Sequence, residues 1–293
     1  MNPTSVSERI NLHFSGLSTA EKRAARALTS NYPAAGLDTV KGLALRAGVS
    51  TATVVRFVQS LEFDGYREFQ EALRTEVAER SESALVQAHR TVTVSDGTRA
   101  PLEVSEQAFT EGIAATFAAL RASEVEEFVT VLADPDVRII AHGGLFSQIL
   151  ARHLVAQLTM FRGNVSVAPE DSLGLADILT RDGDAVWVIF DFRRYSPATL
   201  DLAVRARDRG ARIALVTDRW LSPIAEKADI VLSARVEAAG PSDTLVPALA
   251  LVEALCEHAV EKLGEDGLNR LETVDALRRD IAHIDRTDPI ASE

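Results

Sequence analysis

The spacing of apolar residues divides the chain into two regions, of which the first is helical. Between residues 18 and 80, apolar side chains such as Ala24, Ala25 and Leu28 recur at three- and four-residue intervals, with no alternating strand pattern. Ser18 and Glu21 have the spacing of a capping box, in which each side chain binds a free amide of the first turn. The pattern predicts a helix that begins there and ends at Pro33 and Gly36. Further helices are predicted at about 39–47, 50–61 and 66–79.

The second region begins after residues 134–136, Asp-Pro-Asp, where the periodicity changes. Short runs rich in Val and Ile now alternate with segments of helix length, at 137–141, 165–168, 185–190, 213–217 and 230–232. Runs of this length are typical of parallel strands buried on both faces. They predict an open, mainly parallel five-stranded α/β sheet. Flanking helices are expected at about 104–120, 124–132, 245–263 and 267–284, the second of them opened by a capping box at Ser123 and Glu126.

Two domains and a linker follow from this division. Residues 1–80 form the helical domain, the polar stretch 81–101 forms the linker, and 102–293 form the α/β domain. The length of 293 residues agrees with two domains at roughly 150 residues each.

Composition places the chain among globular proteins, with 46% hydrophobic and 25% charged residues. A single cysteine, Cys256, excludes an intramolecular disulfide and fits a reducing compartment. The first 14 residues lack the features of a secretory signal, and no stretch approaches the ~20 apolar residues of a membrane span. A cytoplasmic protein is expected.

Charge is distributed unevenly between the two domains. The net charge is −12, yet residues 1–80 carry ten basic and nine acidic side chains, so the acidity belongs to the rest of the chain. Such asymmetry indicates that the two parts have different partners. The weak positive balance of the first domain does not by itself identify a ligand.

A helix-turn-helix pattern starts at Val40. In a twenty-residue window, Ala44 takes the fifth position, where two helices approach closely, and Gly48 takes the ninth, at the turn, where a positive φ favours glycine. The positions that face inward between the two helices are all small or apolar: Leu43, Ala47, Val49, Val54 and Phe57.

The outward face of the second helix carries hydrogen-bonding side chains, namely Ser50, Thr51, Thr53, Arg56 and Gln59. Short hydroxyls at a helix N-terminus suit phosphates, and a long cation and an amide farther along can reach base edges. Lys22, Lys41 and Arg46 are further candidate phosphate contacts. The alternative is a plain three-helix bundle whose polar face is only solvated.

Candidate ligand residues of the α/β region follow its strands, where the carboxyl ends of parallel strands meet at one edge of the sheet. Glycine turns, helix caps and arginines gather there, and helix N-termini and arginines both suit a phosphate or carboxylate. The candidates are Gly143, Gly144, Ser147, Arg193, Arg194, Ser196, Thr217 and Ser222. The alternative is that these caps and turns only build the fold.

A family resemblance adds to this interpretation. The string Ala-Gly-Val-Ser-Thr-Ala-Thr-Val-Val-Arg-Phe at 47–57, with Phe-Asp-Gly-Tyr at 63–66, resembles the RpiR family of bacterial transcriptional regulators. The motif of Gly143, Ser147 and Ala151, and the later stretch 217–229, resemble the SIS (sugar isomerase) domain that is fused to such a helix-turn-helix. The resemblance implies a dimeric or tetrameric regulator that binds double-stranded operator DNA and senses a small anionic metabolite, by default a sugar phosphate or a related sugar derivative.

Three departures from the family pattern are visible. Glu62 and Leu145 stand where glycine is usual, and Phe-Asp-Phe-Arg-Arg-Tyr at 190–195 replaces the hydroxyl-rich Ser-x-Ser-Gly-x-Thr phosphosugar loop. Either Arg193 and Arg194 have taken over anion recognition, or the ligand is not a sugar phosphate. A structural role, in which the two arginines pair with Asp191 or other acids, is the third option.

Enzymatic chemistry has weak support in the sequence. The six histidines are scattered, no metal-ligand pattern occurs and no cofactor is predicted. Glu253, Glu257 and His258 share a late helix and are candidate bases for an isomerase, although glutamates on a late amphipathic helix are far more often simply solvated. Cys256 fits a core position. The sequence favours a non-enzymatic regulator; a sugar-phosphate isomerase with a helical extension and a protein-binding adaptor are the alternatives.

Overall fold

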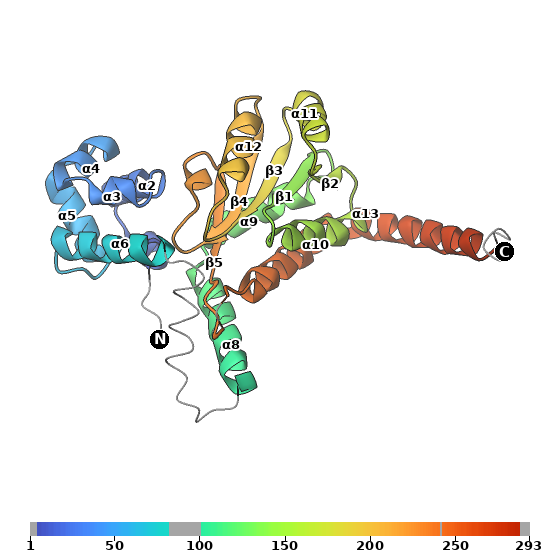
Figure 1. The fold of residues 1–293 in the computed structure, drawn as a ribbon. Coiled ribbons are helices and arrows are strands. Elements are labelled where there is room, and N and C mark those ends of the chain that lie inside the picture. Colours follow the sequence, from blue (N-terminus) through green and yellow to red (C-terminus); the bar gives the residue numbers. More distant parts are fainter. Residues whose placement is uncertain (1–4, 82–100, 241, 288–293) are drawn as a thin grey trace.

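The computed structural model describes residues 5–81, 101–240 and 242–287, which form a helical domain and an α/β domain (Figure 1). The predicted linker at 81–101 lies almost wholly outside the described residues. Within the described part, no helix combines the length and apolar character that crossing a membrane would require.

The helical domain contains the helices expected from the periodicity and two short ones that were not predicted. Its helices are α1 (Val6–His13), α2 (Thr19–Thr29), α3 (Ala34–Leu37), α4 (Val40–Ala47), α5 (Thr51–Ser60) and α6 (Tyr66–Ser81). The capping box at Ser18 and Glu21 is confirmed. Helix α1 escaped prediction because it has only two turns, although Ser5 and Glu8 form a second capping box at its start.

The core of this domain is closely packed around α3. The chain passes so near its neighbours at Gly36 that a Cβ there would lie 2.4 Å from a methyl of Leu73 and 2.8 Å from one of Leu28. Phe69 also contacts this point, at 3.0 Å. Helices α2 and α6 thus both pack against Gly36, where a side chain would require the buried leucines to move.

The α/β domain is built on the five-stranded parallel sheet that the sequence predicts. Its strands are β1 (Ile139–Gly143), β2 (Val165–Val167), β3 (Val186–Asp191), β4 (Arg212–Asp218) and β5 (Ile230–Ala234), in the order β2-β1-β3-β4-β5. All neighbouring strands pair in parallel. The helices are α8 (Pro101–Ala119), α9 (Ala122–Ala133), α10 (Gln148–Thr159), α11 (Ser172–Arg181), α12 (Pro197–Arg207) and α13 (Val246–Thr287).

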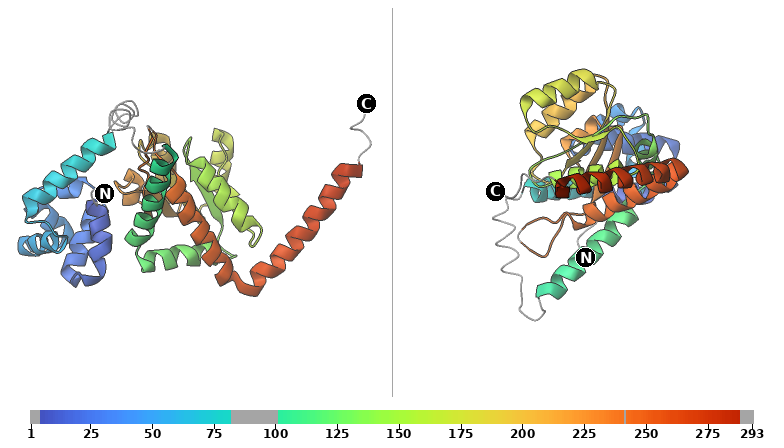
Figure 2. Two further views of the ribbon diagram at one scale, coloured as in Figure 1. Left: turned by 90° about the horizontal axis from the view of Figure 1, so that it is seen from below. Right: turned by 90° about the vertical axis from the view of Figure 1, so that its right-hand side faces the viewer.

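Helices cover both faces of this sheet, so alternate strand residues enter two different cores (Figure 2). Trp187 and Ile189 of β3 pack with α11 and α12, whereas Val186, Val188 and Phe190 pack with α9, α10 and α13. Burial on both sides explains why the strands are continuously apolar rather than alternating.

Of two helix boundaries that the sequence predicts, one is wrong and one is confirmed. The capping box at Ser123 and Glu126 is wrong: α9 already begins at Ala122, and Arg121 occupies the cap position without a side-chain cap. The predicted break between two C-terminal helices is confirmed, because α13 is interrupted at Gly264, whose φ of 56° and ψ of −132° are not helical.

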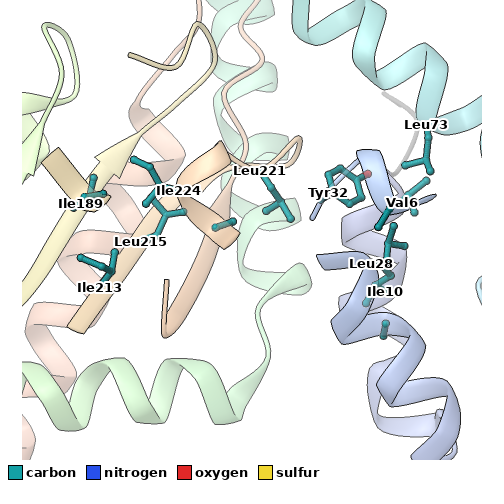
Figure 3. Packing of buried hydrophobic residues seen from close by; sticks show 14 of the residues in the cluster. Val6, Ile10, Leu28, Tyr32, Leu73, Ile189, Ile213, Leu215, Leu221 and Ile224 are labelled. Carbon is teal, nitrogen blue, oxygen red and sulfur yellow. The ribbon is translucent and has the colours of Figure 1, made fainter. Parts of the chain in front are cut away.

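Helix α1 joins the helical domain to the α/β domain. Val6 and Tyr32 on one side and Leu221 on the other belong to a single buried apolar cluster (Figure 3). The N–H of Val6 donates to the carboxylate of Glu76 at 2.6 Å, and the Tyr32 hydroxyl donates to the same carboxylate.

Buried ion pairs reinforce this contact between the domains. Arg235, at the end of β5, pairs with Glu8 of α1 at 2.5 Å, and Arg219, after β4, pairs with Glu79 of α6 at 3.0 Å. Glu237 binds both arginines, at 2.7 Å to Arg219 and 3.3 Å to Arg235. Because a buried charge that loses its partner is costly, these pairs fix how the domains are docked.

The buried carboxyl of Glu76 makes stability depend on pH. Burial raises its pKa from 4.5 to about 7, so the folded chain keeps this proton where the unfolded chain has released it. This contribution to the free energy of unfolding is full below about pH 4.5 and is lost as the pH rises through about 7. We expect Glu76→Gln to flatten the decline of the thermal midpoint between about pH 5 and pH 7.5, measured by circular dichroism. The control is Glu71→Gln on the exposed side of α6, and equal slopes in Glu76→Gln and wild type would contradict the assignment.

Candidate DNA-binding face and ligand site

Helices α4 and α5 have the geometry of a helix-turn-helix. Gly48 ends α4 in the left-handed conformation, with φ 62° and ψ 39°, as its place at the turn requires. The N–H of Val49 then donates to the carbonyl of Ala44 at 3.0 Å, and Ser50 caps α5 by accepting from the N–H of Thr53 at 3.1 Å. The turn therefore aims the N-terminus of α5 and its free amides outward.

The inward positions are filled as the sequence predicts. Leu43, Val54 and Phe57 have no exposed surface and Ala44 retains 4%. Ala47 and Val49 are partly buried at the edge of this core.

Four of the five residues predicted on the outward face of α5 are exposed to solvent, and one is not. Ser50, Thr51, Arg56 and Gln59 are exposed, but Thr53 is buried and its hydroxyl is bonded to that of Ser50 at 2.9 Å. Thr53 precedes both Arg56 and Phe57 by about one turn, and its side chain is buried with Phe57 rather than exposed with Arg56. The prediction that Thr53 faces outward is wrong.

The candidate phosphate contacts surround this face unevenly. Lys41 and Arg46 are exposed on α4, whereas Lys22 is partly buried, with its ammonium 5.6 Å from the centre of the Phe14 ring. Arg56 is close enough to Glu21 of α2 to help lower the pKa of that carboxyl, after the larger effect of its bonds to Ser18. The outward face of α5 is therefore flanked by the cations Lys41 and Arg46, and the carboxylate of Glu21 lies close to Arg56 on it.

The turn after α5 keeps the geometry of a glycine turn although Glu62 occupies it. Glu62 has a φ of 64°, the left-handed conformation that favours glycine. Arg9 of α1 donates to the carbonyls of Leu61 and Glu62 at 3.1 and 3.2 Å, and its guanidinium lies 4.5 Å from the Phe63 ring centre. Helix α1 therefore stabilises the end of α5 as well as the domain contact.

The predicted ligand residues of the α/β domain do lie along the carboxyl edge of the sheet, but most of their hydroxyls are already bonded. Ser147 accepts from the N–H of Gly144 at 2.9 Å and donates to the carbonyl of Phe190 at 2.8 Å. The Thr217 hydroxyl accepts from the N–H of Ser222 at 3.1 Å. The bonds of Ser147 connect the loop after β1 to β3, and both hydroxyl-bearing residues are buried, so neither is accessible to a ligand.

Gly143 and Ser196 have structural roles of the same kind. A Cβ on Gly143 would lie 2.6 Å from the backbone of Ser147, so glycine allows the tight entry into α10, whereas Gly144 has open space around it. Ser196 caps α12 by accepting from the N–H of Thr199 at 3.4 Å.

Two buried carboxylates that are not among the predicted ligand residues hold this edge together. Asp191 accepts from the N–H of Ser196 at 3.4 Å and from the hydroxyl of Ser222. Asp218 accepts from the hydroxyl of Tyr195 at 2.6 Å and from the N–H of Trp220 at 2.9 Å. Burial raises the pKa of Asp191, and that of Asp218 to about 7. The sequence signal that could have identified them is their position as the last residues of β3 and β4.

Arg193 and Arg194 have different environments. The Arg193 side chain is only 4% exposed and binds Asp243 through two nitrogens, with its guanidinium 4.9 Å from the Trp220 ring centre. Arg194 has a φ of 72°, a side chain that is 42% exposed and a distant approach of 4.0 Å to Asp243. The structural option described above therefore applies to Arg193, while Arg194 remains accessible.

A cleft of about 380 Å³ lies beside Arg194, between α6 and the start of α12. Its lining comes from both domains: Arg80, Arg194, Tyr195, Ser196, Pro197, Leu200 and Pro223. The Arg80 guanidinium is 4.5 Å from the centre of the Tyr195 ring. Two arginines and a helix N-terminus thus meet at one opening, which is suitable chemistry for a small anion.

The candidate bases lie elsewhere, on α13. Glu253 is bound to His153 at 2.5 Å and to Gln157 at 3.2 Å, and His258 pairs with Glu261 at 3.3 Å. Cys256 is buried and burial raises its pKa to about 12. The described residues contain no group of His, Cys, Asp or Glu that would hold a metal ion.

Comparison with known proteins agrees with this architecture. The model of the helix-turn-helix domain of the rpiR family matches residues 4–80, and the SIS domain model matches residues 132–257. The uncharacterized HTH-type transcriptional regulator YfhH of Escherichia coli (strain K12) is 29% identical over 179 residues, which are 60% of this chain. The match spans 62% of that relative's length.

Solved structures share the fold. The sugar isomerase domain of an RpiR transcription factor from Sphaerobacter thermophilus is 25% identical with a TM-score of 0.55, over 60% of this chain and 98% of that one. The Vibrio vulnificus NanR protein, solved in complex with ManNAc-6P, is 19% identical with a TM-score of 0.54, over 94% of this chain and 98% of that one.

These findings define a two-domain protein in which an rpiR-type helix-turn-helix precedes a SIS domain. Its first domain belongs to the rpiR family of helix-turn-helix domains.

The environments of the two arginines lead to a stability prediction. Arg193→Ala leaves Asp243 without its main partner, and we expect it to lower the free energy of unfolding by about 3 kcal/mol, the low end for breaking a buried pair, because Asp243 keeps 20% exposure. Arg194→Ala, the matched control, is expected to change it by less than about 0.5 kcal/mol. Urea unfolding of both variants measures this, and equal losses would show that Arg194 is as structural as Arg193.

Proposed function

We propose that this protein is a transcription regulator that binds operator DNA as a homodimer, with α5 as the recognition helix. The exposed face of Ser50, Thr51, Arg56 and Gln59 carries this proposal. Its first-turn amides and hydroxyls are suited to phosphates, and Arg56 and Gln59 extend one and two turns farther toward base edges. Two such helices related by a two-fold axis read half-sites about one helical turn apart.

The charge distribution supports this orientation on DNA. The α/β domain holds the surplus of negative charge and is repelled by the phosphate backbone, so the helical domain is the part that approaches DNA. Lys41 and Arg46 then supply backbone contacts beside the recognition helix. A regulator of this kind acts in the cytoplasm.

The second part of the proposal is an effector, a small anion of the sugar-phosphate or sugar-acid class. Its negative group binds between Arg194 and Arg80 in the cleft, because Arg193, Ser147, Thr217 and Ser222 are committed to internal bonds. ManNAc-6P is the ligand of NanR, but at 19% identity that likeness supports only the fold; the effector class here rests on the residues of the cleft and on the family default.

An anion in this cleft has a direct route to the DNA-binding domain. Arg80 belongs to α6 of the helical domain, whereas Arg194 belongs to the β3–α12 loop. An effector that binds both holds α6 against the sheet edge and so favours one relative placement of the domains. It changes DNA affinity only through its different affinities for the two placements.

The recognition helix is tested by Arg56→Ala. If Arg56 contacts a base edge, we expect specific binding to weaken by about 1–3 kcal/mol, or roughly ten- to a hundredfold, at fixed salt. Arg181→Ala, which removes one exposed charge from α11 of the other domain, is the matched control. Fluorescence anisotropy with an operator duplex selected from a random pool measures both. Unchanged affinity for Arg56→Ala would remove Arg56 from the interface.

The effector site is tested by thermal shift with a panel of sugar phosphates, sugar acids and amino-sugar derivatives. A ligand at 100 times its dissociation constant stabilises the folded state by about 2.7 kcal/mol, which corresponds to a rise of roughly 5–10 °C in the thermal midpoint. We expect Arg194→Ala to abolish this rise and Arg152→Ala, an exposed control on α10, to retain it. A rise that survives in Arg194→Ala would place the effector elsewhere.

A further inference from the structure

The C-terminal part of α13 has an apolar side without a partner among the described residues. After Gly264 the helix changes direction and extends away from the rest of the chain (Figure 1 and the left view of Figure 2). Its first turns remain attached, since Gly267 is buried and Arg270 donates to the carbonyl of Thr159 at 3.3 Å. The stretch from residue 271 to 287, which we call the arm, continues beyond these contacts.

The arm is amphipathic. Leu271, Val274, Leu277 and Ile281 fall on one side at intervals of three and four residues. Leu277 is 56% and Ile281 57% exposed. An apolar stripe of this length on a helix that leaves its own domain indicates a surface that another chain covers.

A groove of complementary character runs beside the first half of the same helix. It has a volume of about 530 Å³ and lies between α8, α9 and the part of α13 before Gly264. Its apolar lining includes Phe117, Val125, Leu251 and Leu255, and Phe117 is 41% exposed. On its rim stands Glu261, whose side chain is 80% exposed.

We propose that the arm of one copy of this chain occupies the groove of a second copy, and the reverse. The bend at Gly264 makes this exchange geometrically simple. A two-fold axis parallel to the bisector of the bend, and displaced by about 5 Å from the plane of the two helix halves, places each arm antiparallel to the first half of the partner's α13, whatever the angle of the bend. The contact is then isologous, so that two identical contacts form at once.

Spacing and charge agree with this arrangement. Antiparallel helices that cross midway between residues 264 and 265 bring Leu271 opposite His258, Val274 opposite Leu255 and Arg278 opposite Leu251, so the stripe lies along the groove. Arg270, on the stripe side of the arm, falls opposite residue 259 and within one turn of the exposed Glu261, so one pair of opposite charges meets across the contact. The other acid of the groove, Glu126, is already bound by Lys262.

The estimated area of the contact reaches the lower limit of specific interfaces. An arm of this length is about 25 Å long and about 10 Å wide. Two reciprocal contacts then bury on the order of 1,000 Å² in total, the size at which specific interfaces begin.

The arm is tested by Leu277→Glu, with Ala276→Glu as the matched control. Both variants add one carboxylate to the same turn, but Ala276 lies on the polar side of the helix. In sedimentation equilibrium of the full chain, we expect a wild-type dimer and a dissociation constant raised about a hundredfold or more in Leu277→Glu only. Leu277 lies beyond the contacts with its own domain, so circular dichroism and the thermal midpoint of the monomer should not change. A monomeric wild type, or equal dissociation constants in both variants, would overturn the proposal.

Cross-linking distinguishes exchange into the groove from direct pairing of two arms. Under the proposal, residue 265 lies near the axis, within about 10 Å of its counterpart, whereas residue 279 is far from its own. A short bifunctional maleimide should therefore link Glu265→Cys to a covalent dimer and leave Arg279→Cys unlinked. The native Cys256 is buried, and the unmodified chain is the blank. Efficient linkage at position 279 without linkage at 265 would show that the arms pair with each other and would overturn the proposal.

Discussion

Two buried arginines determine how the domains of this protein are placed. Arg219 and Arg235 follow β4 and β5 and bind Glu79 and Glu8 of the helical domain, while Glu237 completes both pairs. Charges that have been removed from water are retained only while they are paired, so the docking is specific but depends on every member. Arg219 directly follows Asp218, so the carboxyl edge of the sheet is adjacent in the chain to the contact between the domains. The domain that carries α5 and the domain that carries this edge are therefore held together at the edge itself.

The ligand edge itself is organised around internal acids. Asp191 and Asp218 bind the serine, tyrosine and backbone donors that a phosphate would otherwise use. The loop at 190–195 thus has a carboxylate and two arginines where the family motif has hydroxyls. An anionic group is disfavoured at the centre of such an edge and favoured at its rim, where Arg194 is accessible and Arg80 approaches from the other domain. The effector site that we propose therefore lies at the domain boundary.

Much of the fold was predictable because it depends on local rules. Gly48 with its positive φ, the capping box at Ser18 and Glu21, and five apolar strand runs are each determined by neighbouring residues, and all are confirmed. The prediction that Thr53 is exposed was wrong because neighbouring positions around a helix can differ between exposed and buried. Only the packing of α5 against α2 decides on which side of that boundary Thr53 lies. The capping box predicted at Ser123 is wrong for a related reason: two overlapping starts are both compatible with the sequence, and α9 begins two residues earlier than predicted.

The sequence by itself determined the class of each domain, the order of elements and the residue types gathered at the sheet edge, because periodicity and turn chemistry act over a few residues. It did not determine which member of a pair such as Arg193 and Arg194 is buried. That choice depends on Asp243, some fifty residues away, and on the indole of Trp220. Nor did it determine the joining of the domains through α1, or a helix that leaves its domain after Gly264. Partners distant in sequence meet only when the chain is folded, so tertiary structure alone decided which charges are paired and which remain accessible.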